Sequence, residues 1–475
     1  MHNFVIEGGT VVTMDGARRV IDRGTVHIRD GRIAAVGESE APEDGVERID
    51  ASGMLVLPGL IDAHAHAGHA LVKTLASDDG QGWFDACKQL YTSGSDAEFW
   101  RADAALFALE RIRAGVTTGV SMLGGGDSIS RTDDPRHGDA HCTAIEAAGT
   151  RAVVAVGCNR PPFPWLYKDW DGSGSDEPIS FERQLEVSRE IAANWHGGAG
   201  GRLSVALTYP VSHENQALPE GVTREMVTDH ARQVRALSRE LGLRFTQDGH
   251  REGSIAYAHR EQDILGSDAY LSHCTNLTEA DITALRESGA SVVHNPSAIA
   301  SVRGRCPAPE LIDLGVTVAI GSDAPAPDRS GDMFRHMQQA MHYHRRHFRD
   351  DQVLPPGKAL EMITIDAARA IGMDAEIGSL EPGKKADIVL LDLRKPHLVP
   401  ANMPLHRAIY FANAADIDTT IVDGRILMRG RKVQSVDEEA VMDAADAAIA
   451  RALERTGLHH LLEIRPGFWG KSRYS

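Results

Sequence analysis

Residues 56–66, VLPGLIDAHAH, contain a segment, 60–66, that predicts a short buried strand ending in two histidines. His64 and His66 are two residues apart, so their side chains leave the same face of that strand. Two neutral imidazoles held in this way are good ligands for zinc or another first-row divalent ion. The chain contains 22 histidines, so the pair carries weight only together with its surroundings.

Seven further apolar segments of strand length follow. They are 115–120, 151–157, 202–209, 243–248, 269–274, 291–296 and 316–324. Amphipathic helical segments separate most of them, for example 96–115, 223–242 and one that follows the N-cap residue Thr278 and stops at Gly289. Alternating strands and helices are typical of a parallel sheet, and eight units predict an α/β fold with a (β/α)8 barrel. The active site of such a barrel lies at the carboxyl ends of its strands.

Both ends of the chain have short β segments separated by glycine, aspartate and asparagine. The predicted domains are 1–57 with 376–435 (a composite β-sandwich), 58–375 (the metal-dependent catalytic barrel) and 436–475 (a C-terminal helix and tail). We expect one amphipathic helix from Asp437 to Leu462.

Composition and charge argue against several classes of protein. Apolar residues make up 42% of the chain and charged residues 25%, which is ordinary for a soluble globular protein. The net charge of −17 argues against a nucleic-acid partner, and no segment reaches the roughly 18 apolar residues of a membrane helix. The N-terminus lacks the features of a signal peptide, and the five cysteines form no regular framework. We therefore expect a cytoplasmic protein with reduced thiols and a small-molecule substrate.

Two more polar residues stand at predicted strand ends. His273 ends the sixth strand and Asp323 the eighth. A carboxylate there can bind a metal ion, take a proton from water, or do both, and His273 can bind the ion or orient water and substrate. Each residue alone could be an ordinary polar group near a loop, but four such residues at the ends of one barrel favour a metal site.

The loops suggest where a substrate binds. Trp83 and Phe84 follow the first strand, in a loop that normally lines the pocket, and favour an apolar or aromatic substrate. His69, three residues after His66, either approaches the substrate or is an ordinary residue at the start of a helix. Trp165 lies in the long irregular segment 159–178, which is either a lid over the substrate or a loop packed on its own barrel or on a neighbouring subunit. The glycine-rich segment 124–127 predicts a turn, because no P-loop lysine follows it.

Much of the chain resembles the amidohydrolase superfamily. The segments that carry the resemblance are 56–66, 113–118 (RAGVTT), 270–298, 316–324 (VTVAIGSDA) and 378–393 (GSLEPGKKADIVLLDL). They are most similar to the branch that holds triazine hydrolases and guanine- and adenosine-type ring deaminases. The resemblance implies one divalent metal ion, zinc before iron, cobalt or manganese, and a homodimer or larger homo-oligomer. By motif match, His64, His66 and Asp323 are metal ligands, and His273 is the histidine of strand six.

Strand five departs from this branch. The branch usually has a histidine ligand there, followed three residues later by a glutamate that carries protons to a ring nitrogen. Residues 245–253 are FTQDGHREG instead. The ligand position falls on Gln247 or Asp248, and the glutamate position on His250 or Arg251.

Two sets of ligands can still complete a metal site. In the first, His250 is the third imidazole ligand and Asp248 or Glu252 lies near the substrate. In the second, His273 becomes a ligand and Asp248 supplies an oxygen. We favour the first, because imidazole is the better ligand for these ions. The predicted ligands are then His64, His66, His250 and Asp323, and the predicted catalytic residues are Asp323, His273 and Asp248.

The missing glutamate also affects the expected reaction. Ring deamination loses its clearest proton donor, whereas hydrolysis of an amide, urea or carbamate asks only that Asp323 move a proton from a metal-activated water to the leaving nitrogen. The sequence therefore favours carbon–nitrogen hydrolysis of a small apolar or aromatic amide, urea or carbamate. The alternatives are a deaminase or chlorohydrolase of a heteroaromatic ring, and a catalytically silent scaffold.

Overall fold

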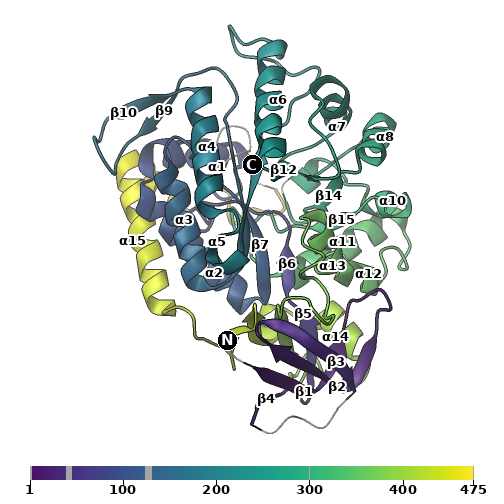
Figure 1. Cartoon of the computed structure of the whole chain (residues 1–475). Coiled ribbons are helices and arrows are strands. Elements are labelled where there is room, and N and C mark those ends of the chain that lie inside the picture. Colours follow the sequence, from purple (N-terminus) through teal and green to yellow (C-terminus); the bar gives the residue numbers. More distant parts are fainter. Residues whose placement is uncertain (1–2, 39–44, 124–130, 299, 474–475) are drawn as a thin grey trace.

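An eight-stranded parallel sheet forms the centre of the molecule (Figure 1). The computed structural model describes residues 3–38, 45–123, 131–298 and 300–473, so the predicted turn at 124–127 lies outside it. The strands are β6 (Leu60–Asp62), β7 (Val116–Met122), β8 (Arg151–Gly157), β11 (Leu203–Thr208), β12 (Arg244–Gln247), β13 (Ala269–Ser272), β14 (Ser291–His294) and β15 (Val318–Ile320). Backbone hydrogen bonds from Ala63 N to Ile320 O and from Asp323 N to His64 O join the first strand to the last. The predicted barrel is confirmed.

Helices surround the sheet, and their first residues follow the capping signals of the sequence. Asp96 and Thr223 each accept a hydrogen bond from a backbone N–H of the helix that follows, and Thr278 forms a capping box with Asp281. The helices between strands and after the last barrel strand are α1 (Gly80–Gln89), α2 (Ala97–Arg113), α3 (Pro135–Ala148), α4 (Phe181–Trp195), α5 (Gly198–Gly201), α6 (Arg224–Glu240), α7 (Ser254–Tyr257), α8 (Glu279–Ser288), α9 (Ala300–Arg303), α10 (Ala308–Asp313), α11 (Met333–Phe348), α12 (Pro356–Glu361), α13 (Ile365–Ala370) and α14 (Pro404–Phe411). One buried apolar cluster joins side chains from seven barrel strands with α13, so it fills the interior of the barrel.

Both chain ends contribute to a second sheet, at the lower end of the barrel in Figure 1. Its strands are β1 (Phe4–Val12), β2 (Val20–Arg29), β3 (Arg32–Glu38), β4 (Glu47–Asp50), β5 (Met54–Pro58), β16 (Ile388–Asp392), β17 (Ile417–Val422), β18 (Arg425–Arg429) and β19 (Lys432–Val433). The two ends meet where β5 pairs antiparallel with β16. The strand that leads into β6 is therefore anchored in this sheet.

The C-terminal helix is shorter than the sequence predicts. α15 (Glu438–Thr456) packs against α2 and ends at Gly457, whose φ of 68° lies in the left-handed region. A separate short helical turn follows at Leu458–Leu462. No helix in the described ranges is both long enough and apolar enough to cross a membrane.

Candidate metal centre and active site

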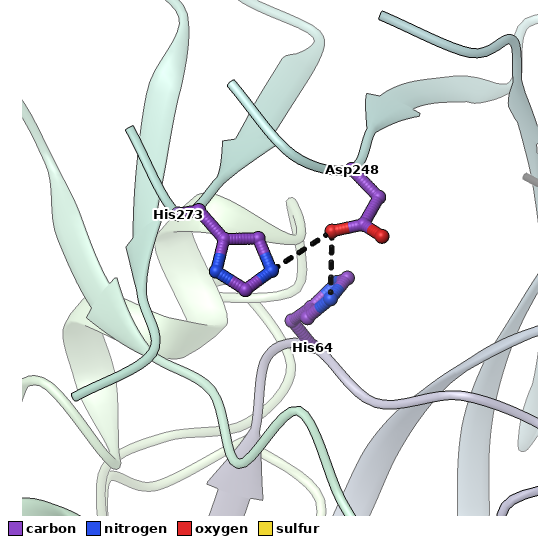
Figure 2. Close-up of side chains that lie close together, drawn as sticks. All are labelled: His64, Asp248 and His273. Carbon is purple, nitrogen blue, oxygen red and sulfur yellow. Dashed lines mark ion pairs between the residues drawn. The ribbon is translucent and has the colours of Figure 1, made fainter. Parts of the chain in front are cut away.

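Five side chains converge at the carboxyl ends of four barrel strands: His64 and His66 after β6, Asp248 after β12, His273 after β13 and Asp323 after β15. Asp248 lies between two rings, with its Oδ1 3.3 Å from His64 Nε2 and 3.0 Å from His273 Nε2 (Figure 2). Its Oδ2 is 3.5 Å from His66 Nε2. The distances place Asp248 inside the cluster.

Asp323 contacts the same rings from another strand. Its Oδ1 is 3.1 Å from His66 Nε2 and 3.5 Å from His64 Nε2, and its Oδ2 is 4.0 Å from His273 Nε2. Arg329 holds the carboxylate in place, with Nη2 3.2 Å from Oδ2 and Nε donating to the Asp323 carbonyl at 2.7 Å. The structure thus brings together His64, His66, His273 and both carboxylates.

The cluster attracts positive charge. Burial by itself lowers the pKa of His64, but the charges of Asp248 and Asp323 outweigh it and raise the pKa to about 10. Burial alone would raise the pKa of each carboxyl. The charge of His64 holds the pKa of Asp248 well below its usual range, and the charge of Arg329 does the same for Asp323. Two ionised carboxylates therefore face three imidazoles in a site closed to most solvent.

Two members of the cluster have an unusual backbone. His273 has a φ of 66° and Asp323 a φ of 53°, in the left-handed region that non-glycine residues seldom adopt. Each such residue costs about 1–3 kcal/mol and persists only where its surroundings impose it. This local strain is typical of residues whose side-chain direction serves a function.

Hydrogen bonds outside the cluster position its members. Ser272 Oγ donates to Asp248 Oδ1 at 2.7 Å. The buried Asp62 carboxylate accepts from Ser322 N at 2.9 Å and Ser322 Oγ at 2.8 Å, and it pairs with Arg111 at 3.1 Å. Since Asp62 ends β6 and Ser322 directly precedes Asp323, these bonds fix the end of β6 relative to the end of β15.

His250 lies outside the cluster. Its Nδ1 is 2.9 Å from Ser254 Oγ and its Nε2 is 3.2 Å from Gln247 Oε1, so both ring nitrogens already have partners. Burial lowers the pKa of His250 to about 3, so the ring is neutral. The geometry matches the second of the two arrangements that the sequence allows, in which Asp248 supplies the oxygen.

A cavity of about 550 Å³ adjoins the cluster and is lined by aromatic residues. Trp83, Phe84 and Tyr91 form part of its wall, together with His69. His69 Nδ1 lies 3.0 Å from Tyr91 Oη, and its ring stands edge-on to Trp83 with centroids 5.0 Å apart. The Nε1 of Trp83 is buried and has no hydrogen-bond partner among the described residues.

Trp165 does not line the cavity. It begins the hairpin of β9 (Trp165–Lys168) and β10 (Asp176–Ile179), and its Nε1 donates to Arg160 O at 2.8 Å. Trp170 Nε1 donates to Ser93 O at 2.8 Å, and Tyr167 is buried. The segment therefore packs on its own barrel.

The sequence did not single out several residues of the cavity wall. Arg160, His213 and Arg303 line it from loops whose approach depends on the closed barrel, as do Arg251 and Arg329. Arg251 was noted only as an alternative at the glutamate position of strand five. Arg329 could have been sought from its position six residues after Asp323, but the other loops carry no local signal.

Comparison with known proteins identifies the family of this chain. Residues 55–427 match the model described as the amidohydrolase family. The chain belongs to this family. A 5′-deoxyadenosine deaminase of Methanosarcina mazei is 31% identical, over 96% of this chain and 99% of its own length. A 5-methylthioadenosine/S-adenosylhomocysteine deaminase of Syntrophomonas wolfei is 28% identical, over 93% of this chain and 97% of its own length.

Solved structures share the fold. An adenosine deaminase of Xanthomonas campestris with bound zinc has a TM-score of 0.80 at 22% identity, covering 95% of this chain and 99% of its own. Atrazine chlorohydrolase of Arthrobacter aurescens, in complex with zinc, has a TM-score of 0.78 at 20% identity, covering 94% and 100%. This amidohydrolase is an enzyme that hydrolyses carbon–nitrogen bonds.

The residues of the amidohydrolase fit a divalent ion. The described residues offer no hydrogen-bond partner to Nδ1 or Nε2 of His64, or to Nδ1 of His273. Both rings are nevertheless buried. Buried polar atoms normally have partners, and imidazole nitrogens with carboxylate oxygens are the donors that zinc accepts. Two overlapping groups offer ligand atoms within 4.8 Å of one another: His64 with Asp248 and His273, and His64 with His66 and Asp323.

Proposed function

We propose that this amidohydrolase is a zinc-dependent deaminase of an amino-substituted heteroaromatic ring, such as the purine of a nucleoside. The observation that carries the proposal is the His/Asp cluster in the wall of a cavity of about 550 Å³ with Trp83, Phe84 and Tyr91 around it. That volume suits a nucleoside-sized ligand, and a flat ring packs well on aromatic side chains. The relatives that are 31% and 28% identical over nearly the whole chain are deaminases of adenine nucleosides.

The metal ligands in this proposal are His64, His66, Asp248, His273 and Asp323, without His250. When bound, the ion acts as a Lewis acid that makes water a nucleophile at neutral pH. Asp248 replaces a neutral imidazole by a carboxylate, so this centre has one more negative charge than a three-histidine, one-aspartate set. We expect that charge to bind the ion more tightly and to make it a weaker Lewis acid.

The reaction needs proton transfer that the chain's own side chains can perform. Asp323 is ionised, faces the cavity and is fixed by Arg329, so it accepts the proton of the attacking water and returns it to the departing nitrogen. The neutral His69 ring and the Trp83 side chain, both on the cavity wall, orient the substrate ring. Water adds to the carbon, one of its protons passes through Asp323 to the departing nitrogen, and the carbon–nitrogen bond breaks to release ammonia. The second water proton ends on the adjacent ring nitrogen as the ring takes its keto form.

A second candidate is hydrolysis of an amide, urea or carbamate. The observation in its favour is Arg251, which stands three residues after Asp248, where the resembled branch has its glutamate. A guanidinium cannot donate a proton to a ring nitrogen, but it can stabilise the oxyanion of an acyl substrate. The relatives favour ring deamination over this candidate.

Ammonia release separates the two candidates. The zinc-loaded protein is incubated with adenosine, 5′-deoxyadenosine and 5′-methylthioadenosine, and ammonia is measured beside the loss of the aminopurine absorbance. We expect one ammonia per product formed, and none with Asp323→Asn, which controls for a contaminating deaminase. Release of an amine from an anilide or aryl urea, with no ammonia from any aminopurine or aminotriazine, would instead establish the second candidate.

A further inference from the structure

The wall of the cavity is rich in arginine although the chain as a whole is acidic. The chain has a net charge of −17. The charged residues that line the cavity are Arg160, Arg251, Arg303, Arg329, Asp248, Glu252 and Asp323. Two of these three carboxylates belong to the His/Asp cluster, and Arg329 pairs with one of them. Away from the cluster, three arginines stand against the single carboxylate of Glu252, so this part of the cavity attracts anions in a molecule whose overall charge repels them.

Arg251 is held by its backbone while its guanidinium has no acidic partner. Its N–H donates to Ser254 Oγ at 2.9 Å, and its carbonyl accepts from the same hydroxyl at 2.6 Å. Its Nε donates to His213 Nε2 at 2.9 Å, which fixes the side chain. Within the part of the chain that the structure describes, Arg251 makes no ion pair with a carboxylate, so its two Nη groups can bind another acceptor.

Arg303 provides a second guanidinium on the wall of the same cavity. It ends α9, after β14, and its side chain lies beside Gly80, the first residue of α1. Its carbonyl accepts from Asn276 Nδ2 at 3.5 Å. Over the described ranges it too has no carboxylate partner, and its side chain is exposed. Unpaired arginines on the wall of a catalytic cavity are not explained by stability, because exposed charges contribute little to it.

We propose that Arg251 and Arg303 bind an oxyanion of the substrate, a carboxylate or a phosphate, outside the ring that reacts. The guanidinium fork matches both groups through two parallel N–H···O bonds. This inference rests on the proposed function, since it assigns the substrate class of that same cavity. The substrate is then an acidic molecule that carries its anion away from the metal centre.

Three probes test the proposal on the zinc-loaded protein: adenosine, which is neutral, adenosine 5′-monophosphate and S-adenosylhomocysteine, which carries a carboxylate. Binding is measured by calorimetry, separately from ammonia release. We expect one charged probe to bind more tightly than adenosine, and the better of the two identifies phosphate or carboxylate. Arg251→Met and Arg303→Met each lower the affinity ratio of that probe to adenosine about 10- to 100-fold. Arg286→Met, on the outer helix α8, removes the same charge away from the cavity and leaves the ratio unchanged.

The outcomes separate this proposal from the proposed function. Failure of both charged probes to bind more tightly than adenosine, or an unchanged ratio in both arginine variants, overturns the oxyanion site. Charge-dependent binding without ammonia release supports the oxyanion site and rejects deamination. Ammonia release from adenosine, with no tighter binding of either charged probe, supports deamination and rejects the oxyanion site.

Discussion

At the scale of the residue, Asp248 distinguishes the proposed metal centre from that of the resembled branch. A carboxylate replaces the imidazole that the family branch places on strand five, and the neighbouring imidazole of His250 is bound by Ser254 and Gln247. Imidazole is the better ligand in isolation. The position of the strand end outweighs that preference, because the side chain that leaves β12 toward the other ligands is Asp248.

Metal content tests this assignment. Asp248→Ala and His273→Ala each remove a proposed ligand, so we expect zinc to fall from about one equivalent in the wild type to well below that after dialysis. His250→Ala is the matched control, since it removes a nearby buried imidazole that lies outside the cluster, and it should retain the ion. Zinc is measured by elemental analysis, with circular dichroism to show that each variant is folded. Loss of zinc in His250→Ala with retention in Asp248→Ala would restore the arrangement that the sequence favours.

At the scale of the element, helix α2 supports the loop that follows β6 and its two histidines. Asp103 is buried on α2 and accepts hydrogen bonds from Gly68 N at 2.7 Å and Ala70 N at 2.8 Å. These bonds hold the turn that places His69 against the cavity. Burial raises the pKa of Asp103 to about 6. Ionisation of this carboxyl at neutral pH therefore lowers the stability of the fold.

The pH dependence of stability follows from that shift. Between about pH 4 and pH 6 the folded protein keeps a proton on Asp103 that the unfolded chain, with a carboxyl pKa of 3.8, has released, so Asp103 destabilises the fold increasingly as pH rises. We expect the free energy of unfolding of Asp103→Asn, minus that of the wild type, to rise by about 3 kcal/mol over this range and then to level off. Urea unfolding at each pH measures the difference. A difference that does not change with pH would show that the pKa of Asp103 is not raised.

At the scale of the whole molecule, a buried ion pair joins the barrel to the sheet made by the chain ends. Arg151 begins β8 and Asp387 precedes β16, and their two N–H···O bonds measure 3.0 and 3.1 Å. Asp387 Oδ1 also accepts from Asp423 N at 2.8 Å. Since the sheet holds β5, which leads into β6 and the His/Asp cluster, this pair connects the two parts that must keep their relative position.

Breaking this pair should destabilise the fold without emptying the metal centre. Arg151→Met leaves a buried carboxylate without its partner, so we expect the free energy of unfolding to fall by about 3–5 kcal/mol, with zinc content unchanged. Asp387→Leu should have a similar effect. The free energy of unfolding of the double variant should fall by clearly less than the sum of the two single decreases. Denaturant titrations with a single spectroscopic probe give the three values. Strict additivity would mean that the two side chains do not interact in the folded protein.

The sequence by itself determined the features that depend on local spacing. The period of apolar residues placed the eight barrel strands, and the capping residues Thr278 and Gly289 marked the ends of α8, because both signals act within a few residues. The two-residue spacing of His64 and His66 was enough to put both rings on one face. The end of the last long helix was missed, because Gly457 stops it within an otherwise continuous helical pattern.

Only the tertiary structure decided which strand-end residues meet. Closure of the barrel brings Asp248 and Asp323 to the same imidazoles, and it brings Arg251 and Arg303 to one cavity from loops about 50 residues apart in the chain. Strand five contains two candidate ligands separated by a single glycine, and no local rule distinguishes them. The choice depends on the twist and register of strands that are distant in sequence, because these set the direction in which each side chain leaves the sheet.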